Sequence, residues 1–333
     1  MAKFKVYYTI ELNEVATHIF ESNDFEVKLC SHNDEETYVK ELAEFQPDAI
    51  MCRTEPITAK MMDTCKNLKV IGKQGAGLDN IDMDHAHAKD ITVVYAPAGN
   101  ANAVAEHAVM LMLMCAKRFT YVDRQFRGGN FLVRMGMEHT YELGGKTLGM
   151  IGCGRISQLA MQKCKYGFGM NVIGYDPYLT QDKIGDLCEL KATAKEVWEQ
   201  ADFVSVHLPV VPSTEHSIGR EQFSWMKPTA SFINCARGAL IKENELVECL
   251  KDGTLFQAGL DVFEHEPIQE SSRELFDLDN VIMTPHMAAT TEQSVLNCCT
   301  SVANDIVAVC NGQEPKVKAQ KPQIGRASCR ERV

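Results

Sequence analysis

Residues 152–176 have the types and spacing of a site that binds phosphate and ribose groups. An apolar run over 147–151 ends at Gly152, and Gly154 follows after one cysteine. Apolar residues then recur three and four positions apart, as on the buried face of a helix. A second apolar run ends at Asp176, 22 residues beyond Gly154. We predict a strand, a tight turn, a helix and a second strand in this order.

Each part of this segment has a physical role in binding a dinucleotide. Gly152 permits the tight turn, and Gly154 lets the backbone approach a pyrophosphate at the positive end of the helix. Asp176 would accept hydrogen bonds from ribose hydroxyls and repel a 2′-phosphate, so NAD is preferred to NADP. Ser157 replaces a third glycine that serves close helix–strand packing, and it is small enough for that place. The alternative is a glycine-rich turn of an ordinary α/β protein.

Length and composition indicate a protein of about two ordinary domains. Of its 333 residues, 45% are hydrophobic and 24% are charged, and the formal net charge of −11 disfavours nucleic acid and anionic membranes as partners. The N-terminus lacks an apolar signal segment, and the most apolar region, residues 103–116, is too short to span a bilayer. The 13 cysteines are scattered without CxxC pairs, so we expect free thiols in a reducing cytoplasm and no metal site.

Strand-like and helical patterns alternate along the chain, which predicts parallel sheets. Expected strands cover residues 4–8, 26–29, 49–52, 68–71, 91–95, 147–151, 170–175, 203–207, 231–234, 255–260 and 281–284. Expected helices include 37–44, 59–66, a long amphipathic helix over 102–118 with Glu106 in its first turn, and a last helix over about 291–310. Four of the later strands end in polar or charged residues, at the edge where open parallel sheets bind ligands.

The segment 324–333 differs in character from the rest of the chain. It is cationic and has no periodicity, and its residues follow the translation of a common sequencing adapter. We expect it to be an artefact of sequence assembly and exclude it from the fold. A genomic reading frame that continues through Val333 would contradict this expectation.

Four segments together make the chain similar to a known family. They are GLDNID at 77–82, NANAVAEHA at 100–108, INCARGALIKENELVECLKDGTLFQAGLDVFEHEP at 233–267 and TPH at 284–286. In this order and spacing the chain resembles the D-isomer-specific 2-hydroxyacid dehydrogenases up to about residue 320. The resemblance implies an α/β protein with a Rossmann-type NAD-binding domain over 101–287. A flavodoxin-like substrate (catalytic) domain would comprise 1–100 plus 288–323, and a homodimer would form through the cofactor domain.

The resemblance also implies roles for particular residues. Arg237 would bind the substrate carboxylate and polarise its carbonyl, His286 would be the general acid/base, and Glu266 would pair with this histidine. The cofactor-binding positions would be Gly152, Gly154, Arg155, Ile156, Asp176, Leu208, Pro209, Thr214, Cys235, Ala236 and Asp261. The substrate would meet the backbone of Gly75, Ala76 and Gly77, with Arg53 as a further candidate.

Some of these residues have competing interpretations. His207 also ends an expected strand and competes with the family's acid/base histidine, while Glu264 competes for the place of its partner. His207 and His265 are otherwise expected to be structural. Arg237 could be a surface arginine that follows a turn.

We therefore expect an NAD-dependent enzyme that interconverts a D-2-hydroxy acid and its 2-oxo acid, in a cleft whose closure excludes water. YDPY at 175–178 resembles 3-phosphoglycerate dehydrogenases. However, Lys73 and Gln74 replace an arginine-rich loop of many of these enzymes, only Arg53 and Lys73 could serve a phosphate, and the chain is short for their regulatory domains. A hydroxypyruvate/glyoxylate or D-lactate-type reductase is the alternative.

Two alternative functions from other protein classes remain. A formate dehydrogenase would carry glutamine as the partner of its histidine, so Glu266 disfavours it. A non-catalytic NAD(H)-sensing, corepressor-like protein could have the same triad of site residues. Turnover of a 2-oxo acid would distinguish an enzyme from such a protein.

Overall fold

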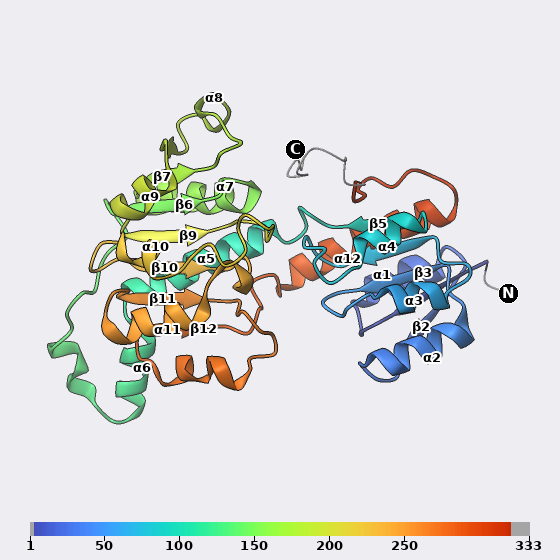
Figure 1. The fold of residues 1–333 in the computed structure, drawn as a ribbon, viewed down its shortest axis with the longest axis horizontal. Helices are drawn as coiled ribbons and strands as arrows, with labels where there is room; N and C mark the ends of the chain where they lie inside the picture. Colours follow the sequence, from blue (N-terminus) through green and yellow to red (C-terminus); the bar gives the residue numbers. More distant parts are fainter. Residues whose placement is uncertain (1–2, 321–333) are drawn as a thin grey trace. The chain divides into compact units, whose positions relative to one another are not determined.

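The structure, a computed structural model, describes residues 3–320. The expected artefact, 324–333, lies outside the described residues, as do residues 321–323 of the expected substrate domain. Within the described part, the chain divides into two compact units (Figure 1). The first contains the residues up to Asn100 and those from Thr290 onward, and the second contains Ala101–Ala289.

The first unit is built on a five-stranded parallel sheet. Its strands are β1 (Phe4–Tyr8), β2 (Phe25–Leu29), β3 (Ala49–Cys52), β4 (Val70–Lys73) and β5 (Thr92–Tyr95). The spatial order β2-β1-β3-β4-β5 is that of flavodoxin-like folds, which confirms the predicted class. All residues of β3 and β4 are buried, as expected for parallel strands covered on both faces.

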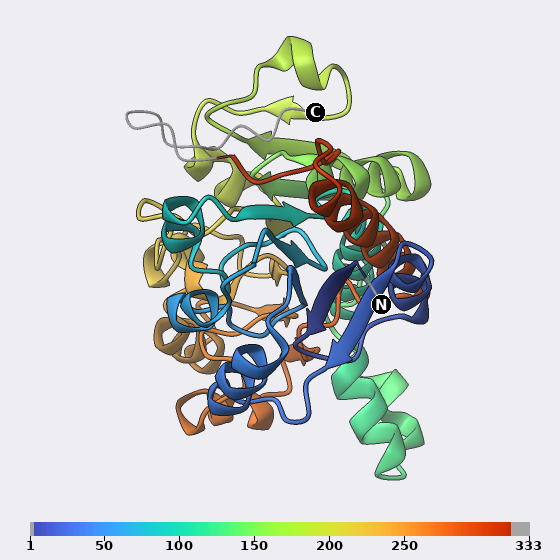
Figure 2. The ribbon, with the colours of Figure 1, turned by 90° about the vertical axis from the view of Figure 1, so that its right-hand side faces the viewer.

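Helices cover both faces of this sheet (Figure 2). One face carries α1 (Glu14–Glu21) and α12 (Glu292–Cys310), and the other carries α2 (Glu35–Phe45), α3 (Ala59–Thr64) and α4 (Met83–Ala88). Each helix follows an Asn, Asp or Thr whose side chain accepts a hydrogen bond from a backbone N–H of the first turn. The helix α12 approaches β4 so closely that a Cβ at Gly72 would lie 2.4 Å from the Ile306 side chain.

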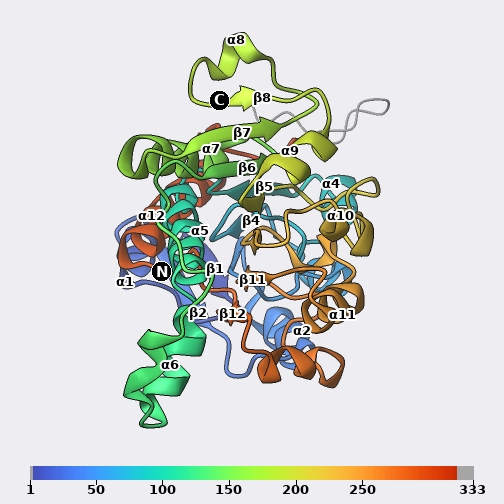
Figure 3. The same ribbon diagram turned by 90° about the vertical axis from the view of Figure 1, so that its left-hand side faces the viewer.

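The second unit contains a seven-stranded parallel sheet (Figure 3). Its strands are β6 (Thr147–Ile151), β7 (Asn171–Tyr175), β8 (Glu189–Leu190), β9 (Phe203–Val206), β10 (Ser231–Asn234), β11 (Gln257–Leu260) and β12 (Val281–Met283). The order is β12-β11-β10-β9-β6-β7-β8, so the chain builds outward from β6 to β8 and restarts beside β6 with β9. This is the doubly wound Rossmann order, with its switch point between β6 and β9. The predicted fold class is confirmed.

The helices of this unit differ in part from the expectation. They are α5 (Ala101–Ala116), α6 (Phe119–Arg127), η1 (Phe131–Met135), α7 (Arg155–Gln162), η2 (Lys163–Gly167), α8 (Gln181–Ile184), α9 (Ala194–Gln200), α10 (Arg220–Ser224), η3 (Gly238–Leu240), α11 (Glu243–Asp252) and η4 (Glu270–Asp277). Ten of the sixteen residues of α5 are buried, so its apolar surface is wider than the predicted amphipathic face. Its exposed residues, Asn102, Glu106 and Met110, are four positions apart and lie on one stripe. It packs against α7 and against β10, β11 and β12. Contrary to the prediction, Glu106 does not lie in the first turn of α5, because the helix begins at Ala101.

The described cysteines have free thiols. There are twelve of them, and all except Cys30 are buried. Burial raises the pKa of several, that of Cys52 to about 12, so these thiols stay protonated at neutral pH. Within residues 3–320, no helix is long and apolar enough to cross a membrane.

His207 directly follows β9, and its surroundings are those of a structural histidine. Its Nε2 lies 2.9 Å from the hydroxyl of Ser205, which is fully buried. Burial lowers the pKa of His207 to about 4, because desolvation disfavours the charged imidazolium. His207 is therefore neutral at physiological pH.

This pKa predicts how stability depends on pH. The unfolded chain takes up a proton at His207 near pH 6.5, whereas the folded protein does so only near pH 4. The free energy of unfolding should therefore fall as the pH decreases from about 6.5 to about 4. Urea unfolding at several pH values would measure this fall in wild type and in His207→Gln, whose amide can still bond Ser205. The variant should lose less stability over this range, and equal losses would contradict the assignment.

Candidate active site

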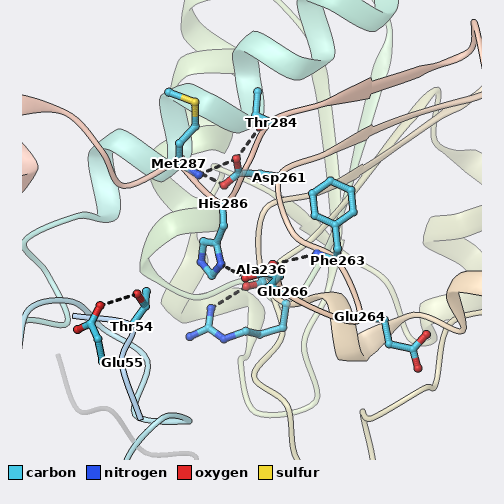
Figure 4. A network of polar contacts seen from close by, with 12 residues as sticks. Thr54, Glu55, Ala236, Asp261, Phe263, Glu264, Glu266, Thr284, His286 and Met287 are labelled. Carbon is cyan, nitrogen blue, oxygen red and sulfur yellow. Dashed lines mark hydrogen bonds and ion pairs between the residues drawn. The ribbon is translucent and has the colours of Figure 1, made fainter. Parts of the chain in front are cut away.

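His286 and Glu266 form a hydrogen-bonded pair beyond the carboxyl ends of β12 and β11 (Figure 4). His286 Nδ1 lies 2.5 Å from Glu266 Oε2. The other Glu266 oxygen accepts from the backbone N–H of Phe263 at 3.0 Å, which holds the carboxylate in place. A carboxylate at Nδ1 selects the tautomer with its hydrogen there and leaves Nε2 to exchange a proton with a ligand. The His286 side chain is 40% exposed, so a ligand can reach it.

The competing acidic residue, Glu264, contacts a different histidine. Its Oε1 lies 2.8 Å from Nε2 of His216. Figure 4 shows the Glu264 side chain directed away from His286. Because Glu264 is engaged elsewhere, the geometry favours Glu266 as the partner of His286.

The turn that carries His286 has an unusual backbone conformation. The φ angle of His286 is 49°, in the left-handed region that residues with a Cβ seldom adopt. Its N–H donates to the Asp261 carbonyl at 2.8 Å. The N–H groups of Met287 and Ala288 donate to the Asp261 carboxylate, each at 2.9 Å. Asp261, the residue that follows β11, therefore fixes the orientation of this turn.

The Asp261 carboxylate is fully buried yet ionised. Burial alone would raise its pKa, but hydrogen bonds from His107, Thr284 and the N–H groups of Met287 and Ala288 bring the pKa below its ordinary value. His107, on α5, was not among the predicted site residues. No sequence pattern links it to β11, because its contact arises only from the packing of α5 on the sheet.

Arg237 follows β10 through a turn shaped by a buried asparagine. The Asn234 side chain accepts from the N–H of Ala236 and donates to the carbonyl of Arg237, both at 2.9 Å. Arg237 Nη1 donates to the Ala236 carbonyl at 2.6 Å. A guanidinium that is partly buried and anchored to the backbone differs from a solvated surface charge. Asn234 is a second site residue that the sequence prediction missed.

The Arg237 turn lies directly against the loop that carries Glu266. A Cβ at Gly238 would fall 1.9 Å from the carbonyl carbon of Phe263, so only glycine fits there. Phe263 in turn donates its N–H to Glu266. The structure therefore brings Arg237, Glu266 and His286 to one edge of the sheet in the second unit.

The glycine turn after β6 has the two features that a pyrophosphate site needs. Gly152 has a φ of 86°, and a Cβ there would lie 2.6 Å from the His207 carbonyl oxygen. A Cβ at Gly154 would meet nothing within 4 Å, so the space before the N-terminus of α7 is open. Ser157 is buried and donates to the Gly152 carbonyl at 2.6 Å, so it fits the place of the third glycine. Arg155 and Ile156 begin α7 at this open end.

Asp176 lies at the end of β7, above the glycine turn. Its carboxylate accepts from the backbone N–H groups of Cys153 at 3.0 Å and Tyr178 at 2.9 Å. Each oxygen has a further lone pair for a ribose hydroxyl. The open turn and this carboxylate together fit the diphosphate and ribose of NAD.

The remaining cofactor candidates lie in loops at the same sheet edge. Thr214 donates to the Pro209 carbonyl at 2.6 Å and so closes the loop that follows Leu208. Cys235 and Ala236 belong to the Arg237 turn. Burial, with the nearby Asp261 charge, raises the pKa of Cys235 well above its ordinary value, so its thiol is neutral.

The predicted substrate residues lie in the first unit, at the ends of two paired strands. Arg53 follows β3 and the residues Gly75, Ala76 and Gly77 follow β4, and Cys52 pairs with Lys73 in the register of these strands. They therefore lie at one edge of the first sheet. Arg53 Nη2 donates to Thr290 Oγ1 at 2.8 Å.

Comparisons with known proteins cover most of the chain. Residues 109–288 match the model of the D-isomer specific 2-hydroxyacid dehydrogenase, NAD binding domain. D-3-phosphoglycerate dehydrogenase of Methanocaldococcus jannaschii is 38% identical over 322 residues, which cover 96% of this chain and 60% of that protein. Hydroxypyruvate reductase of Thermotoga maritima is 36% identical over 296 residues, which cover 88% and 94% of the two chains. The chain thus spans about 60% of the length of the first of these relatives.

Solved structures show the same fold. D-lactate dehydrogenase from Aquifex aeolicus, complexed with NAD and lactic acid, has a TM-score of 0.83 at 26% identity and covers 96% of this chain and 100% of its own. A glyoxylate reductase from Paecilomyes thermophila has a TM-score of 0.84 at 26% identity, with coverages of 96% and 98%. The family model itself matches more than half of the sequence. The chain therefore belongs to the D-isomer-specific 2-hydroxyacid dehydrogenase family, and its second unit contains the family's NAD-binding domain.

Proposed function

We propose that the protein is an NAD-dependent oxidoreductase that interconverts a D-2-hydroxy acid and its 2-oxo acid by hydride transfer. The observation that carries the proposal is the His286–Glu266 pair, at 2.5 Å, on the sheet edge that also carries the Arg237 turn and the open glycine turn. An acid/base group and an arginine at the carboxyl edge of a dinucleotide-binding sheet are the groups that this reaction needs.

The roles of the three side chains follow from their chemistry. His286 has Nδ1 engaged by Glu266, so its Nε2 would give a proton to the carbonyl oxygen in reduction and take it back in oxidation. Arg237 would bind the carboxylate with its planar, permanently charged fork and polarise the adjacent carbonyl. When bound, NAD supplies the hydride chemistry at C2 of the substrate.

The residues that would hold NAD are those of the Rossmann unit. The N–H groups at the start of α7 would bind the pyrophosphate beside Gly154, where space is open. Asp176 would accept from the ribose hydroxyls, and its charge favours NAD over NADP. Buried, reduced thiols support the expected cytoplasmic location.

For the substrate, two candidates have separate support. Similarity to D-3-phosphoglycerate dehydrogenases at 34% and 38% identity favours a phosphorylated 2-hydroxy acid. Burial of Lys73, one of the two cations considered for a phosphate, favours a smaller acid such as hydroxypyruvate, glyoxylate or lactate. A smaller acid also agrees with the match to hydroxypyruvate reductase of Thermotoga maritima, which covers 94% of the length of that protein.

We also propose that the protein forms a homodimer through an arm of the second unit. The arm comprises α6 and η1 and extends away from the sheet (Figures 1 and 3). No residue of α6 is buried, and five large apolar side chains on the arm are 50% to 75% exposed: Phe119, Phe126, Phe131, Leu132 and Met135. An apolar surface of this kind is typical of a protein interface, and a second copy of the chain would supply the same surface.

The reaction can be tested by NADH oxidation with a panel of phosphohydroxypyruvate, hydroxypyruvate, glyoxylate, pyruvate and a branched 2-oxo acid. We expect turnover of at least one, with kcat/KM lowered about 10²- to 10⁴-fold in His286→Ala because the acid/base group is lost. His265→Ala, at an exposed neighbour of Glu266, is the control and should stay active. Tight NADH binding without turnover on any substrate would instead support a corepressor-like protein.

A pair of glycine variants tests the cofactor site. Gly154→Ala should weaken NADH binding by about tenfold or more without unfolding the protein, because its methyl group enters the space assigned to the pyrophosphate. Gly152→Ala should lower stability, since a left-handed φ costs about 1–2 kcal/mol for other residues and the new Cβ would meet the His207 carbonyl. Calorimetric titration and thermal unfolding measure the two effects. Wild-type NADH affinity in Gly154→Ala would refute this site.

The dimer can be tested with a charge placed on the arm. Leu132→Glu should shift the protein from dimer to monomer in sedimentation equilibrium, because a buried unpaired carboxylate opposes association. Tyr178→Glu changes a similarly exposed side chain outside the arm and should leave the dimer intact. A monomeric wild type, or equal effects of the two substitutions, would disprove the proposed interface.

A further inference from the structure

His107 is connected to the turn of His286 by a series of polar contacts. Its Nε2 lies 2.8 Å from Thr284 Oγ1, and Thr284 Oγ1 lies 2.5 Å from Asp261 Oδ1. We propose that His107 is a positioning residue for the acid/base histidine: it orients Thr284, Thr284 orients Asp261, and Asp261 fixes the turn of His286. The inference rests on the proposed function, because the group positioned is the proposed acid/base. We call His107, Thr284 and Asp261 the relay.

The hydrogens in the relay can be arranged in one direction only. An ionised carboxylate can only accept, so the single hydroxyl hydrogen of Thr284 points to Asp261 (Figure 4). The Thr284 oxygen must then accept from His107, whose Nε2 carries a hydrogen. The same N–H lies 3.4 Å from Asp261 Oδ1. Each donor is therefore needed, and none can be exchanged with another.

Burial makes these contacts strong and difficult to replace. Asp261 is fully buried, and the His107 side chain is 11% exposed. In such surroundings an ionised group that lacks a donor is costly, so the carboxylate would move toward another donor if His107 were lost. Because α5 packs on β11 and β12, water does not readily take the place of the imidazole.

Movement of Asp261 would disturb His286 in particular. The Asp261 carboxylate accepts from the N–H groups of Met287 and Ala288, the two residues after His286. With a φ of 49°, His286 has a strained backbone conformation. These two bonds hold it in place together with the bonds from the His286 N–H to the Asp261 and Thr284 carbonyls. A small rotation of the turn would take the imidazole away from Glu266, and a displacement near 1 Å can lower a rate about 10²-fold.

The test compares variants that break the relay with variants that retain its hydrogen bonds. His107→Leu and Thr284→Val remove a donor, whereas His107→Gln and Thr284→Ser keep one. In His107→Leu and Thr284→Val we expect kcat to fall about 10- to 100-fold. KM should change by less than about threefold because Arg237 stays in place, and the Kd for NADH should change less than kcat because Gly154 and Asp176 lie outside the relay. The Gln and Ser variants should recover most of kcat.

A stability control separates positioning from folding. Leu148→Ala opens a cavity at a buried residue of β6 and should lower the thermal midpoint with little change in kcat. If His107→Leu behaves like Leu148→Ala, or if His107→Gln is no more active than His107→Leu, the positioning role is overturned. Two independent breaks in the relay keep the test valid if one variant does not fold.

A second readout needs no turnover. The Nδ1 proton of His286, in its short bond to Glu266, should give a downfield proton NMR signal that is absent from His286→Ala. This signal should shift or disappear in His107→Leu and persist in His107→Gln. If wild type binds NADH but turns over no 2-oxo acid, the proposed function fails while this signal still decides the positioning role. An unchanged signal in His107→Leu would overturn the inference.

Discussion

Asp261 is an ionised carboxylate buried in protein, so it needs hydrogen-bond donors around it. The second unit must supply these donors. Its donors come from α5, from the residue after β12, and from the turn beyond it. His107 lies 177 residues before Thr284, whereas Thr284, Met287 and Ala288 are close together in the sequence. The charge is therefore stable only once α5 has packed on the sheet. The arrangement of the acid/base turn is therefore a consequence of how one charge is solvated by protein.

Two close backbone approaches hold the surrounding loops together. Gly238 lies against Phe263, which joins the loop after β10 to the loop after β11. Gly152 lies against the carbonyl of His207, which joins the turn after β6 to the end of β9. The β6–β9 pair is the switch point of the sheet. Loops that approach so closely leave little freedom for the residues that they carry.

Much of the fold could be predicted from hydrophobic periodicity and from the residues that typically end strands and helices. The strand boundaries of β1, β3, β6 and β10 agree with the sequence pattern, and those of β3, β6 and β10 are followed directly by arginine, glycine and cysteine. Two-residue β8 and the arm of α6 and η1 were missed. A two-residue strand is too short to show alternation, and α6 has an apolar side although none of its residues is buried. For α5 the extent of burial was underestimated, because protein covers most of the surface of this helix.

The site residues also divide into those that the local sequence predicts and those that only the packed fold brings together. Glycine and aspartate in the Rossmann turn act through local backbone geometry, so their spacing alone predicts them. His107 and Asn234 act through hydrogen bonds that form only after packing, and nothing in their local sequence distinguishes them from other buried polar residues. Between Glu264 and Glu266, the resemblance to the family favoured Glu266, and the pairs Glu264–His216 and Glu266–His286 support that choice.

The place of α12 has a consequence for the order of events during synthesis on the ribosome. The second unit is continuous in sequence, and every strand of its sheet has been made once Met283 has emerged. The first unit must wait for Glu292–Cys310, because these residues cover β4 at Gly72. The half of the protein that begins first is thus the last to close its core, and the apolar face of β4 depends on another cover until translation of α12 is finished.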